Sequence, residues 1–486
     1  MDALMTAPRP PRIVAWLPGT AASFSAWLRQ TYSASGLLYG TVILLNAVLV
    51  LSGLVLAHYL GIDVISSLTQ LPLDDNACVP AFEGLGNHCF GDYALVRQLA
   101  LMPNPWIDID GFKFNYPAAG MMPHGLFTLV GVITGSSRVG LYGYLLVLIV
   151  GMTAPAVWAT KGKAIWIRIL TGSVFGVLSA PALMVLDRGN SVGLLAPILL
   201  VLLVALRREQ YLLATVAIVL GTMVKPQFVV LLVVLLVVRR WKFALISVAG
   251  IGFTNLLPYL FWPKDFPSTI LLSLQNILSY GGGVSLNDEF PANVSFAEPL
   301  HSVEIIIRML AGRSTQHTWV DGHQNLVGAV ILLIVVAALV VLGKRIPGHI
   351  AAILLAATAC LFPGVSWSYY LVFAIPVAAV LLRDPLVSSP DRVVWKGVLD
   401  DERLRHSWLG VLSDVLLVIA TAFSVGRLLL PEPARIPGRT VTEVVRTTGE
   451  LAPLLWLLAI TATLLAWTVA RDARLQRTDK DQLTVG

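Results

Sequence analysis

The sequence predicts an all-α polytopic membrane protein. Hydrophobic residues make up 56% of the 486-residue chain and charged residues only 13%, and the mean hydropathy is +0.78. A chain of this composition cannot form a water-soluble surface. The net charge of +6 does not indicate a nucleic-acid partner, because most Lys and Arg residues stand in short groups at the ends of apolar stretches, where they set orientation.

Apolar stretches of membrane-spanning length recur along the chain. The first, residues 38–57, is close to the ~20 residues that a helix needs to cross about 30 Å of hydrocarbon. Placing the later basic groups, which begin with Lys161 and Lys163, on the cytoplasmic side fixes the direction of each crossing. The other predicted crossings are 140–159, 164–186, 191–206, 209–224, 226–238, 243–261, 324–343, 347–363, 366–382, 409–429 and 451–470. We therefore expect about 12 transmembrane helices in the cell (plasma) membrane, with both termini cytoplasmic.

The apolar segment 118–135 does not fit this threading. A full crossing there would place Lys161 and Lys163 outside and would invert every helix that follows. We therefore expect a re-entrant or partly inserted helix, which is tolerated only where protein covers its backbone.

Two long segments, 58–117 and 262–323, are predicted on the outer side, with a shorter one at 430–449. Loops longer than about 15 residues are usually functional or disordered unless they have structure of their own. In the first segment, residues 92–101 have the spacing of a short amphipathic helix. Cys78 and Cys89 also lie there, outside the cytoplasm, and we favour a disulfide between them over free thiols.

Polar residues that are expensive to bury fall on the same outer face. Asp92 stands at the start of the outer helix, where an isolated aspartate is most simply an N-cap. Lys225 lies within apolar sequence, so its ammonium needs an anionic partner or an aqueous cavity. A phosphate would suit Lys225 together with the forked donor of Arg188 and the nearby Asn190. The alternative is a pair between Arg188 and the adjacent Asp187, with Lys225 reaching to the interface.

The order of these motifs resembles glycosyltransferase family 87, the GT-C-type family that includes polyprenyl-phosphate-sugar-dependent mannosyl- and arabinofuranosyltransferases of actinobacteria. The resemblance covers roughly residues 38–385, and the order of the motifs along the chain carries it rather than any single one. The motifs are Gly91-Asp92-Tyr93-Ala94-Leu95-Val96-Arg97, Phe114-Asn115-Tyr116-Pro117, Gly189-Asn190, Val224-Lys225-Pro226, Arg239-Arg240-Trp241 and Asn293-Val294-Ser295.

This resemblance implies a GT-C-type fold with two large extracytoplasmic loops. It also implies an inverting, metal-independent transfer of one sugar from a polyprenyl-phosphate donor to a glycolipid or cell-envelope polysaccharide acceptor outside the cytoplasm. Asp92 would be the general base, and Lys225, Arg188 and Asn190 would bind the donor phosphate. Further substrate contacts are expected from Tyr93, Arg97, Tyr116, Asn293, Trp367, Tyr369 and Tyr370. We expect no cofactor and no metal, because no dense cluster of carboxylates or His residues is present in the sequence.

Two departures from the family pattern leave the transferred sugar open. Tyr116-Pro117 continues into Ala118, whereas family members often have a second proline there. Tyr369-Tyr370 stands where mannosyltransferase members tend to have a His pair, and the tyrosines are closer to the arabinofuranosyl branch. The transferred sugar could therefore be either mannose or arabinofuranose.

Two other classes of protein would use a similar membrane face. A transporter or flippase of lipid-linked sugars also contains intramembrane Lys and broken helices, but the sequence shows no inverted repeat. A lipid-linked glycan polymerase or ligase would share the lipid phosphate and the arginines. For the transferase, we expect the domains 1–37 (cytoplasmic tail), 38–385 (transmembrane catalytic module), 386–408 (cytoplasmic connector), 409–470 (C-terminal transmembrane helices) and 471–486 (cytoplasmic tail).

Overall fold

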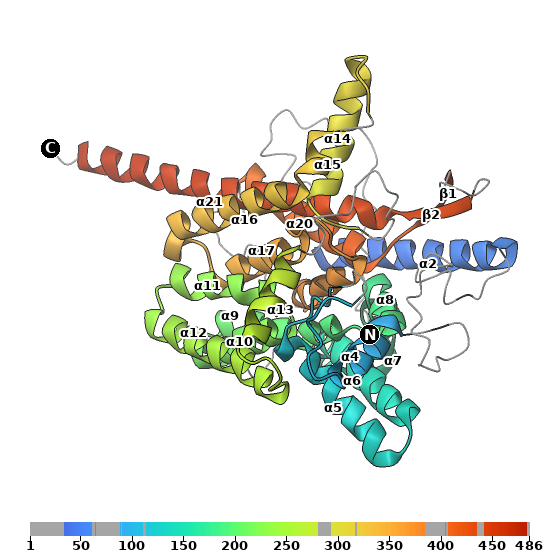
Figure 1. Ribbon diagram of the computed structural model, residues 1–486. Helices are drawn as coiled ribbons and strands as arrows, with labels where there is room; N and C mark the ends of the chain where they lie inside the picture. The colour runs from blue at the N-terminus through green and yellow to red at the C-terminus, as the bar shows by residue number, and fades with distance from the viewer. Residues whose placement is uncertain are drawn as a thin grey trace, which may run out of the picture.

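The computed structural model describes residues 34–60, 64, 88, 90–109, 113–279, 293–315, 318–383, 404, 407–434 and 442–483. Most of the predicted N-terminal tail, the two cysteines Cys78 and Cys89, and nearly all of the predicted connector 386–408 lie outside the described residues. The described part is a bundle of helices with one short hairpin of strands (Figure 1).

The helices of the first half follow one another closely. They are α2 (Ala34–Leu60), α4 (Gly91–Ala100), α5 (Ala118–Thr134), α6 (Ser137–Ala159), α7 (Ile165–Gly172), η1 (Ser173–Val177), α8 (Ala180–Arg188), η2 (Ser191–Leu194), α9 (Leu195–Arg207), α10 (Tyr211–Val224), η3 (Pro226–Leu231), α11 (Leu232–Val237), α12 (Trp241–Leu256) and η4 (Leu257–Phe261). The second half contains α13 (Ser268–Ser279), α14 (Ala297–Leu310), α15 (Trp319–Gly322), α16 (Gln324–Leu342), η5 (Gly343–Arg345), α17 (Gly348–Leu361), η6 (Ser368–Phe373), α18 (Ala374–Leu382), α20 (Trp408–Val425), η7 (Thr448–Glu450) and α21 (Leu451–Leu483).

Each predicted crossing corresponds to a helix or to a run of helical segments. Six helices among the described residues are long and apolar enough to cross a membrane, and α7–η1 with α8 makes a seventh if this bent pair counts as one span. The other predicted crossings are apolar helices of 10–17 residues. The structure thus supports a multi-pass membrane protein, and the number of twelve crossings stays a prediction.

The crossing predicted at 164–186 is not a straight helix. It bends by 59° between η1 and α8. The backbone leaves the helical region at Gly176, and Pro181 lies in the first turn of α8, where its missing N–H costs no helical hydrogen bond. The bend directs the C-terminal end of α8, with Arg188, toward α4.

Two of the short apolar helices, α17 and α18, are buried at the centre of the bundle. In α18 every residue is buried, and in α17 every residue from His349 to Leu361 is buried. A helix surrounded by other helices does not have to match the thickness of the lipid, because its ends contact protein rather than hydrocarbon. The central helices can therefore end below the membrane surface and leave room for polar groups there.

Helices α5 and α6 form a tightly packed hairpin. Gly135 joins them in a left-handed conformation (φ 69°), and a Cβ atom at Gly140 would lie 2.3 Å from the carbonyl oxygen of Phe127. The first half of α5 is buried, whereas Leu126, Leu129 and Ile133 are exposed on one side. The predicted partly inserted segment is therefore an apolar helix packed on a longer one, with apolar side chains on its exposed side, and its depth in the bilayer stays a prediction.

The three segments predicted on the outer side contain regular secondary structure. The first contains α4, the second contains α13, α14 and α15, and the third forms an antiparallel hairpin. In this hairpin β1 (Leu429–Ala434) pairs with β2 (Thr442–Thr447), with Leu429 opposite Thr447 and Ala434 opposite Thr442. This hairpin contains the strands found in the described part of the chain.

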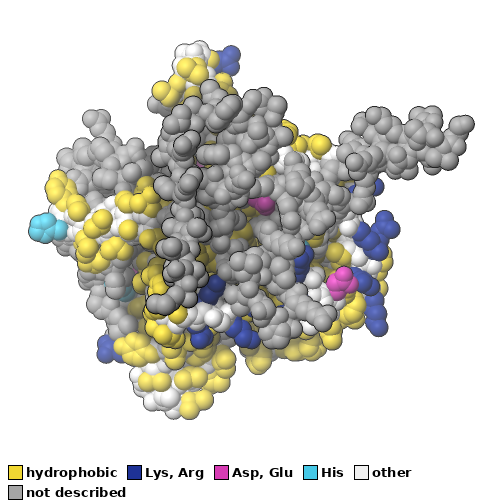
Figure 2. Space-filling view, turned by 180° about the vertical axis from the view of Figure 1, so that it is seen from behind, with side chains coloured by type: hydrophobic (Ala, Val, Ile, Leu, Met, Phe, Trp, Pro, Cys, Tyr) yellow, Lys and Arg dark blue, Asp and Glu magenta, His cyan; other side chains and the backbone are white. Residues whose placement is uncertain are grey.

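The surface of the bundle is suited to lipid. Figure 2 shows apolar side chains over much of the described rear face, with Lys and Arg side chains in small groups. The membrane-spanning windows of α2, α12 and α16 are less than one-third buried within the protein, so most of their apolar side chains face outward. Such a surface is stable only in a bilayer or a detergent micelle.

Candidate active site

Helix α4, in the segment predicted on the outer side, carries Asp92 on its buried side. The helix begins at Gly91, after Phe90 in a left-handed conformation (φ 49°), and it buries the predicted face of Tyr93, Val96 and Leu99. Asp92 lies in the first turn and is 8% exposed. The residue at the N-cap position is Phe90, without a side-chain capping bond, so the capping interpretation of Asp92 is wrong.

The carboxylate of Asp92 is held by the segment that follows α8. Arg188 donates from Nη2 to Oδ1 at 2.9 Å and from Nε to Oδ2 at 3.4 Å, and Asn190 donates from Nδ2 to Oδ2 at 2.8 Å. Burial by itself would raise the pKa of Asp92, but the charge of Arg188 and the hydrogen bonds from Arg188 and Asn190 outweigh it and lower the pKa. Asp92 is therefore ionised at neutral pH.

Gly189 makes this approach possible. It adopts a left-handed conformation (φ 63°) at the end of α8, and a Cβ atom there would lie 2.7 Å from the Cβ of Tyr93. Only glycine allows the backbone to turn here while α4 packs directly against it. The turn places Arg188 and Asn190 on either side of the Asp92 carboxylate.

Asn190 links Asp92 to a second polar group. Its Nδ2 also donates to the hydroxyl of Tyr116 at 2.9 Å, and its Oδ1 accepts from the backbone N–H of Val192 at 2.9 Å, which caps η2. Burial raises the pKa of the Tyr116 hydroxyl well above its ordinary value, and the charge of Asp92 adds to this effect. The tyrosine is therefore a neutral hydrogen-bonding group.

Lys225 lies in the break between α10 and η3, and its side chain reaches the same place. Lys225 is 7% exposed, and its Nζ lies 4.2 Å from the ring centroid of Tyr116 and 5.6 Å from that of Tyr370. In the part of the chain that the structure describes, no carboxylate lies within ion-pair distance of this ammonium. Two aromatic faces and the nearby charge of Asp92 stabilise this buried cation in part, although no carboxylate among the described residues forms an ion pair with it.

The segment before η6 closes the other side. The guanidinium of Arg188 lies 5.1 Å from the ring centroid of Trp367, whose ring is parallel to that of Tyr369 at 6.0 Å. Asn293 pairs with Trp367 in an isolated β-bridge and holds this segment, because its Oδ1 accepts from the N–H of Ser366 at 2.8 Å. Its Nδ2 donates to Glu298 at 2.8 Å.

The structure brings most of the predicted site residues together and separates the others. Mutual contacts join seven of them into one cluster, which we call the recess: Asp92, Arg188, Asn190, Lys225, Tyr116, Trp367 and Tyr370. Behind them, Tyr93 packs on Tyr144 and His124, and Arg97 lies more than a helical turn further along α4. Asn293 positions the segment with Trp367, and Tyr369 stacks behind that tryptophan.

His124 and Tyr144 form a buried support that the sequence did not reveal. His124 Nε2 lies 3.1 Å from the carbonyl oxygen of Gly189 and 3.1 Å from the hydroxyl of Tyr144. The sequence feature that could have predicted this support is a histidine inside an apolar helix, because a buried histidine needs hydrogen-bond partners. The pair fixes the turn that carries Arg188 and Asn190.

The alternative ion pair within α8 is not found. Asp187 Oδ1 lies 2.6 Å from His88 Nδ1, and Arg188 turns to Asp92 instead. Consecutive residues of a helix point in different directions, so Asp187 and Arg188 do not face each other.

Together the bundle and this group of residues define a class: a multi-pass membrane protein with a buried carboxylate, two buried cationic side chains and aromatic walls beside them. The model of glycosyltransferase family 87 matches residues 116–364, just over half of the chain, and the chain belongs to this family. It is thus a membrane glycosyltransferase, which requires a sugar donor and an acceptor. A search of curated proteins found no match.

The family match includes Tyr116, Arg188, Asn190, Lys225 and Asn293. Asp92 precedes the matched region, and the segment with Trp367, Tyr369 and Tyr370 follows it. The described residues contain no group of three or more His, Cys, Asp or Glu side chains that could hold a metal ion.

Proposed function

We propose that this protein transfers a single mannosyl or arabinofuranosyl residue from a polyprenyl-phosphate donor to a glycolipid or cell-envelope polysaccharide acceptor on the extracytoplasmic face. The observation that supports it best is the pairing of an ionised carboxylate with a buried ammonium that has no anionic partner among the described residues. A carboxylate can accept a hydroxyl proton, and a buried cation fits a phosphate.

In the proposed reaction, Asp92 takes the proton of the acceptor hydroxyl as its oxygen attacks the anomeric carbon. The bond from that carbon to the phosphate oxygen breaks, the configuration inverts, and the lipid phosphate leaves with one additional negative charge. Lys225 and Arg188 stabilise this charge in a site with little water, where electrostatic interactions are strong. Cationic side chains thereby serve a monophosphate leaving group without a metal.

Arg188 has two roles in this scheme. In the structure it holds Asp92, and its guanidinium also faces the ring of Trp367 beside the recess. A donor phosphate that binds Arg188 would weaken its bond to Asp92 and add a negative charge nearby. Both effects raise the proton affinity of the carboxylate and make it a better base once the donor is present.

The donor class can be tested directly. Purified protein in sealed lipid vesicles is incubated with an acceptor membrane extract and radiolabelled polyprenyl-phosphate-mannose, polyprenyl-phosphate-arabinose or a lipid-linked oligosaccharide. We expect transfer from one of the two monophosphate donors, at an undiminished rate in EDTA. Transfer only from the oligosaccharide donor would instead identify a polymerase or ligase, and labelled donor crossing the bilayer without transfer would identify a flippase.

A further inference from the structure

A second group of cations lies at the opposite end of the bundle from Lys225. The segment η3–α11 begins after Lys225 and ends before Arg239. The helix α16 begins beside the recess, where Asn325 accepts the N–H of Gly364 at 3.0 Å, and it ends before Lys344. Both helical segments therefore run from the recess to the opposite end of the bundle, and they place Arg239 and Lys344 there, on the side predicted to be cytoplasmic.

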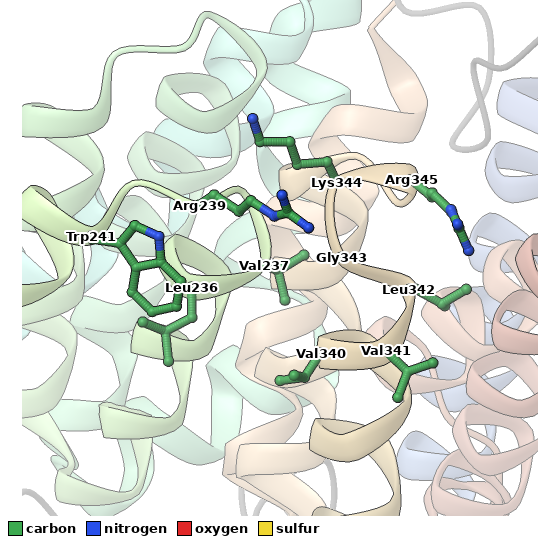
Figure 3. A pocket seen from close by; sticks show the side chains of 10 residues that line it. All are labelled: Leu236, Val237, Arg239, Trp241, Val340, Val341, Leu342, Gly343, Lys344 and Arg345. Carbon is green, nitrogen blue, oxygen red and sulfur yellow. The ribbon is translucent and has the colours of Figure 1, made fainter.

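A pocket of about 450 Å³ lies between these two helix ends. Its wall is apolar, and Arg239, Lys344 and Arg345 stand at its rim. Figure 3 shows the side chains of Arg239 and Lys344 on the same side of the pocket, above the apolar wall, whereas Arg345 turns away. The apolar residues of the wall are Leu236, Val237, Trp241, Val340, Val341 and Leu342.

The rim carries positive charge without a matching acid. None of the described residues that line the pocket is Asp or Glu. Within the described residues, neither Arg239 nor Lys344 has an ion-pair partner. The neighbouring Arg240 is different, because its guanidinium lies 4.3 Å from the ring centroid of Tyr211 and 3.8 Å from the carboxylate of Glu209.

The wall is open to the bilayer. Val340 is 54% exposed, Val341 is 69% exposed and Trp241 is 60% exposed. Valine side chains this exposed on a spanning helix contact acyl chains, and tryptophan at a helix end is typical of the membrane–water interface. An occupant of the pocket therefore meets hydrocarbon contacts below and two cations above.

We propose that this pocket binds an anionic phospholipid of the surrounding bilayer, with its phosphate between Arg239 and Lys344 and an acyl chain along Val340, Val341 and Leu236. Basic pockets between helices at the cytoplasmic surface have this combination of charge and apolar wall. The proposal is independent of the sugar transfer described above.

Orientation by positive charge explains Lys and Arg at this surface but not their arrangement. Arg239 adopts a left-handed backbone conformation (φ 57°) that favours glycine, and it lies just beyond Val238, the C-cap of α11. Arg240 satisfies the same orientation rule while facing Glu209 and Tyr211. Replacing Arg240 therefore removes an equal charge from the same surface without touching the pocket, which makes it the matched control.

The test is a titration of the full-length, delipidated protein with phosphatidylglycerol in detergent, followed by native mass spectrometry. The variants are R239Q, K344Q, the double variant and the control R240Q. We expect each single change at the pocket to weaken phosphatidylglycerol binding about fivefold, and the double change to weaken it more than tenfold. R240Q should bind as the unchanged protein does, and phosphatidylcholine should bind poorly throughout.

Four outcomes would overturn the proposal. The double variant could retain full phosphatidylglycerol binding. R240Q could lose as much phosphatidylglycerol affinity as R239Q, which would show that only the general surface charge matters. Phosphatidylcholine could bind as tightly as phosphatidylglycerol, which would leave only an apolar groove. Glycerol phosphate could displace the lipid at equal concentration, which would indicate a site for a free phosphate compound.

Discussion

At the scale of single residues, a substitution of Asp92 tests the proposed mechanism most directly. Asp92→Asn keeps the shape of the side chain but cannot accept a proton at neutral pH. We expect turnover to fall by roughly 10²-fold or more. The change is measured as sugar transfer alongside the melting temperature in detergent.

The neighbouring Asp187 supplies a control for that substitution. It is also buried, but it pairs with His88 rather than with Arg188. Asp187→Asn should change turnover far less than Asp92→Asn. Near-normal turnover in Asp92→Asn would remove this residue from the mechanism, whatever the control shows.

A second residue-scale prediction concerns Lys225. Lys225→Met keeps the apolar stem and removes the charge, so the KM for the donor should rise more than tenfold, or by about 1.5–3 kcal/mol. The melting temperature should hold, because the ammonium has no carboxylate partner in the described part of the chain to leave unpaired. Lys264→Met, at an exposed lysine in a segment predicted on the outer side, is the control. An unchanged donor KM would show that Lys225 does not contact the phosphate.

A third prediction follows from the pKa of Asp92. Burial raises it, and Arg188 is the strongest influence that lowers it. In Arg188→Gln the pKa of Asp92 should therefore rise, and the acid limb of the kcat/KM profile should move to higher pH. The pH dependence of the residual activity measures this change in the pKa of Asp92. The infrared band of the protonated carboxyl group, which Asp92→Asn should lack, measures it independently. An acid limb at the same pH in both proteins would contradict this assignment.

The lowered pKa of Asp92 also makes the stability of the protein depend on pH. A carboxyl group whose pKa is lowered by folding contributes stability that is complete above its unfolded pKa and is lost as the pH falls. The Asp92–Arg188 pair should therefore hold α4 to α8 at neutral pH and release it in acid.

At the scale of elements, the close packing of α5 on α6 predicts a sharp contrast between two glycines. Gly140→Ala places a Cβ 2.3 Å from the carbonyl oxygen of Phe127, so the helices have to separate, which should cost about 1–3 kcal/mol. Gly125→Ala has nothing within 4 Å and should be neutral or stabilising by up to about 1 kcal/mol. Melting temperatures in detergent compare the two. Equal effects would mean that α5 does not pack on α6 in this way.

Helix positions could be predicted from the sequence because apolar length and Lys/Arg placement are local properties. The bend at Gly176 could not, since whether a glycine and a nearby proline break a span depends on what packs around them. For the site, the shared face of Asp92, Arg188 and Lys225 followed from topology. The partner of Arg188 did not, because side-chain direction on a helix and the bend of α8 decide it.

At the scale of the whole molecule, the orientation in the membrane rests on charge distribution and can be measured in intact cells. With Cys78, Cys89 and Cys360 replaced, a cysteine at the exposed position 264 should react with an impermeant thiol reagent. A cysteine at the exposed position 242 should react only after the cells are broken. The reverse pattern would invert the topology and place the recess in the cytoplasm.

The sharing of Arg188 between Asp92 and the recess has a consequence for proton linkage. If donor binding draws Arg188 from the carboxylate, it raises the proton affinity of Asp92. Reciprocity then requires that protonation of Asp92 strengthen donor binding by the same factor. Donor affinity should therefore increase as the pH falls, while catalysis, which needs the ionised carboxylate, declines. Binding and turnover would have opposite pH dependences, set by one arginine.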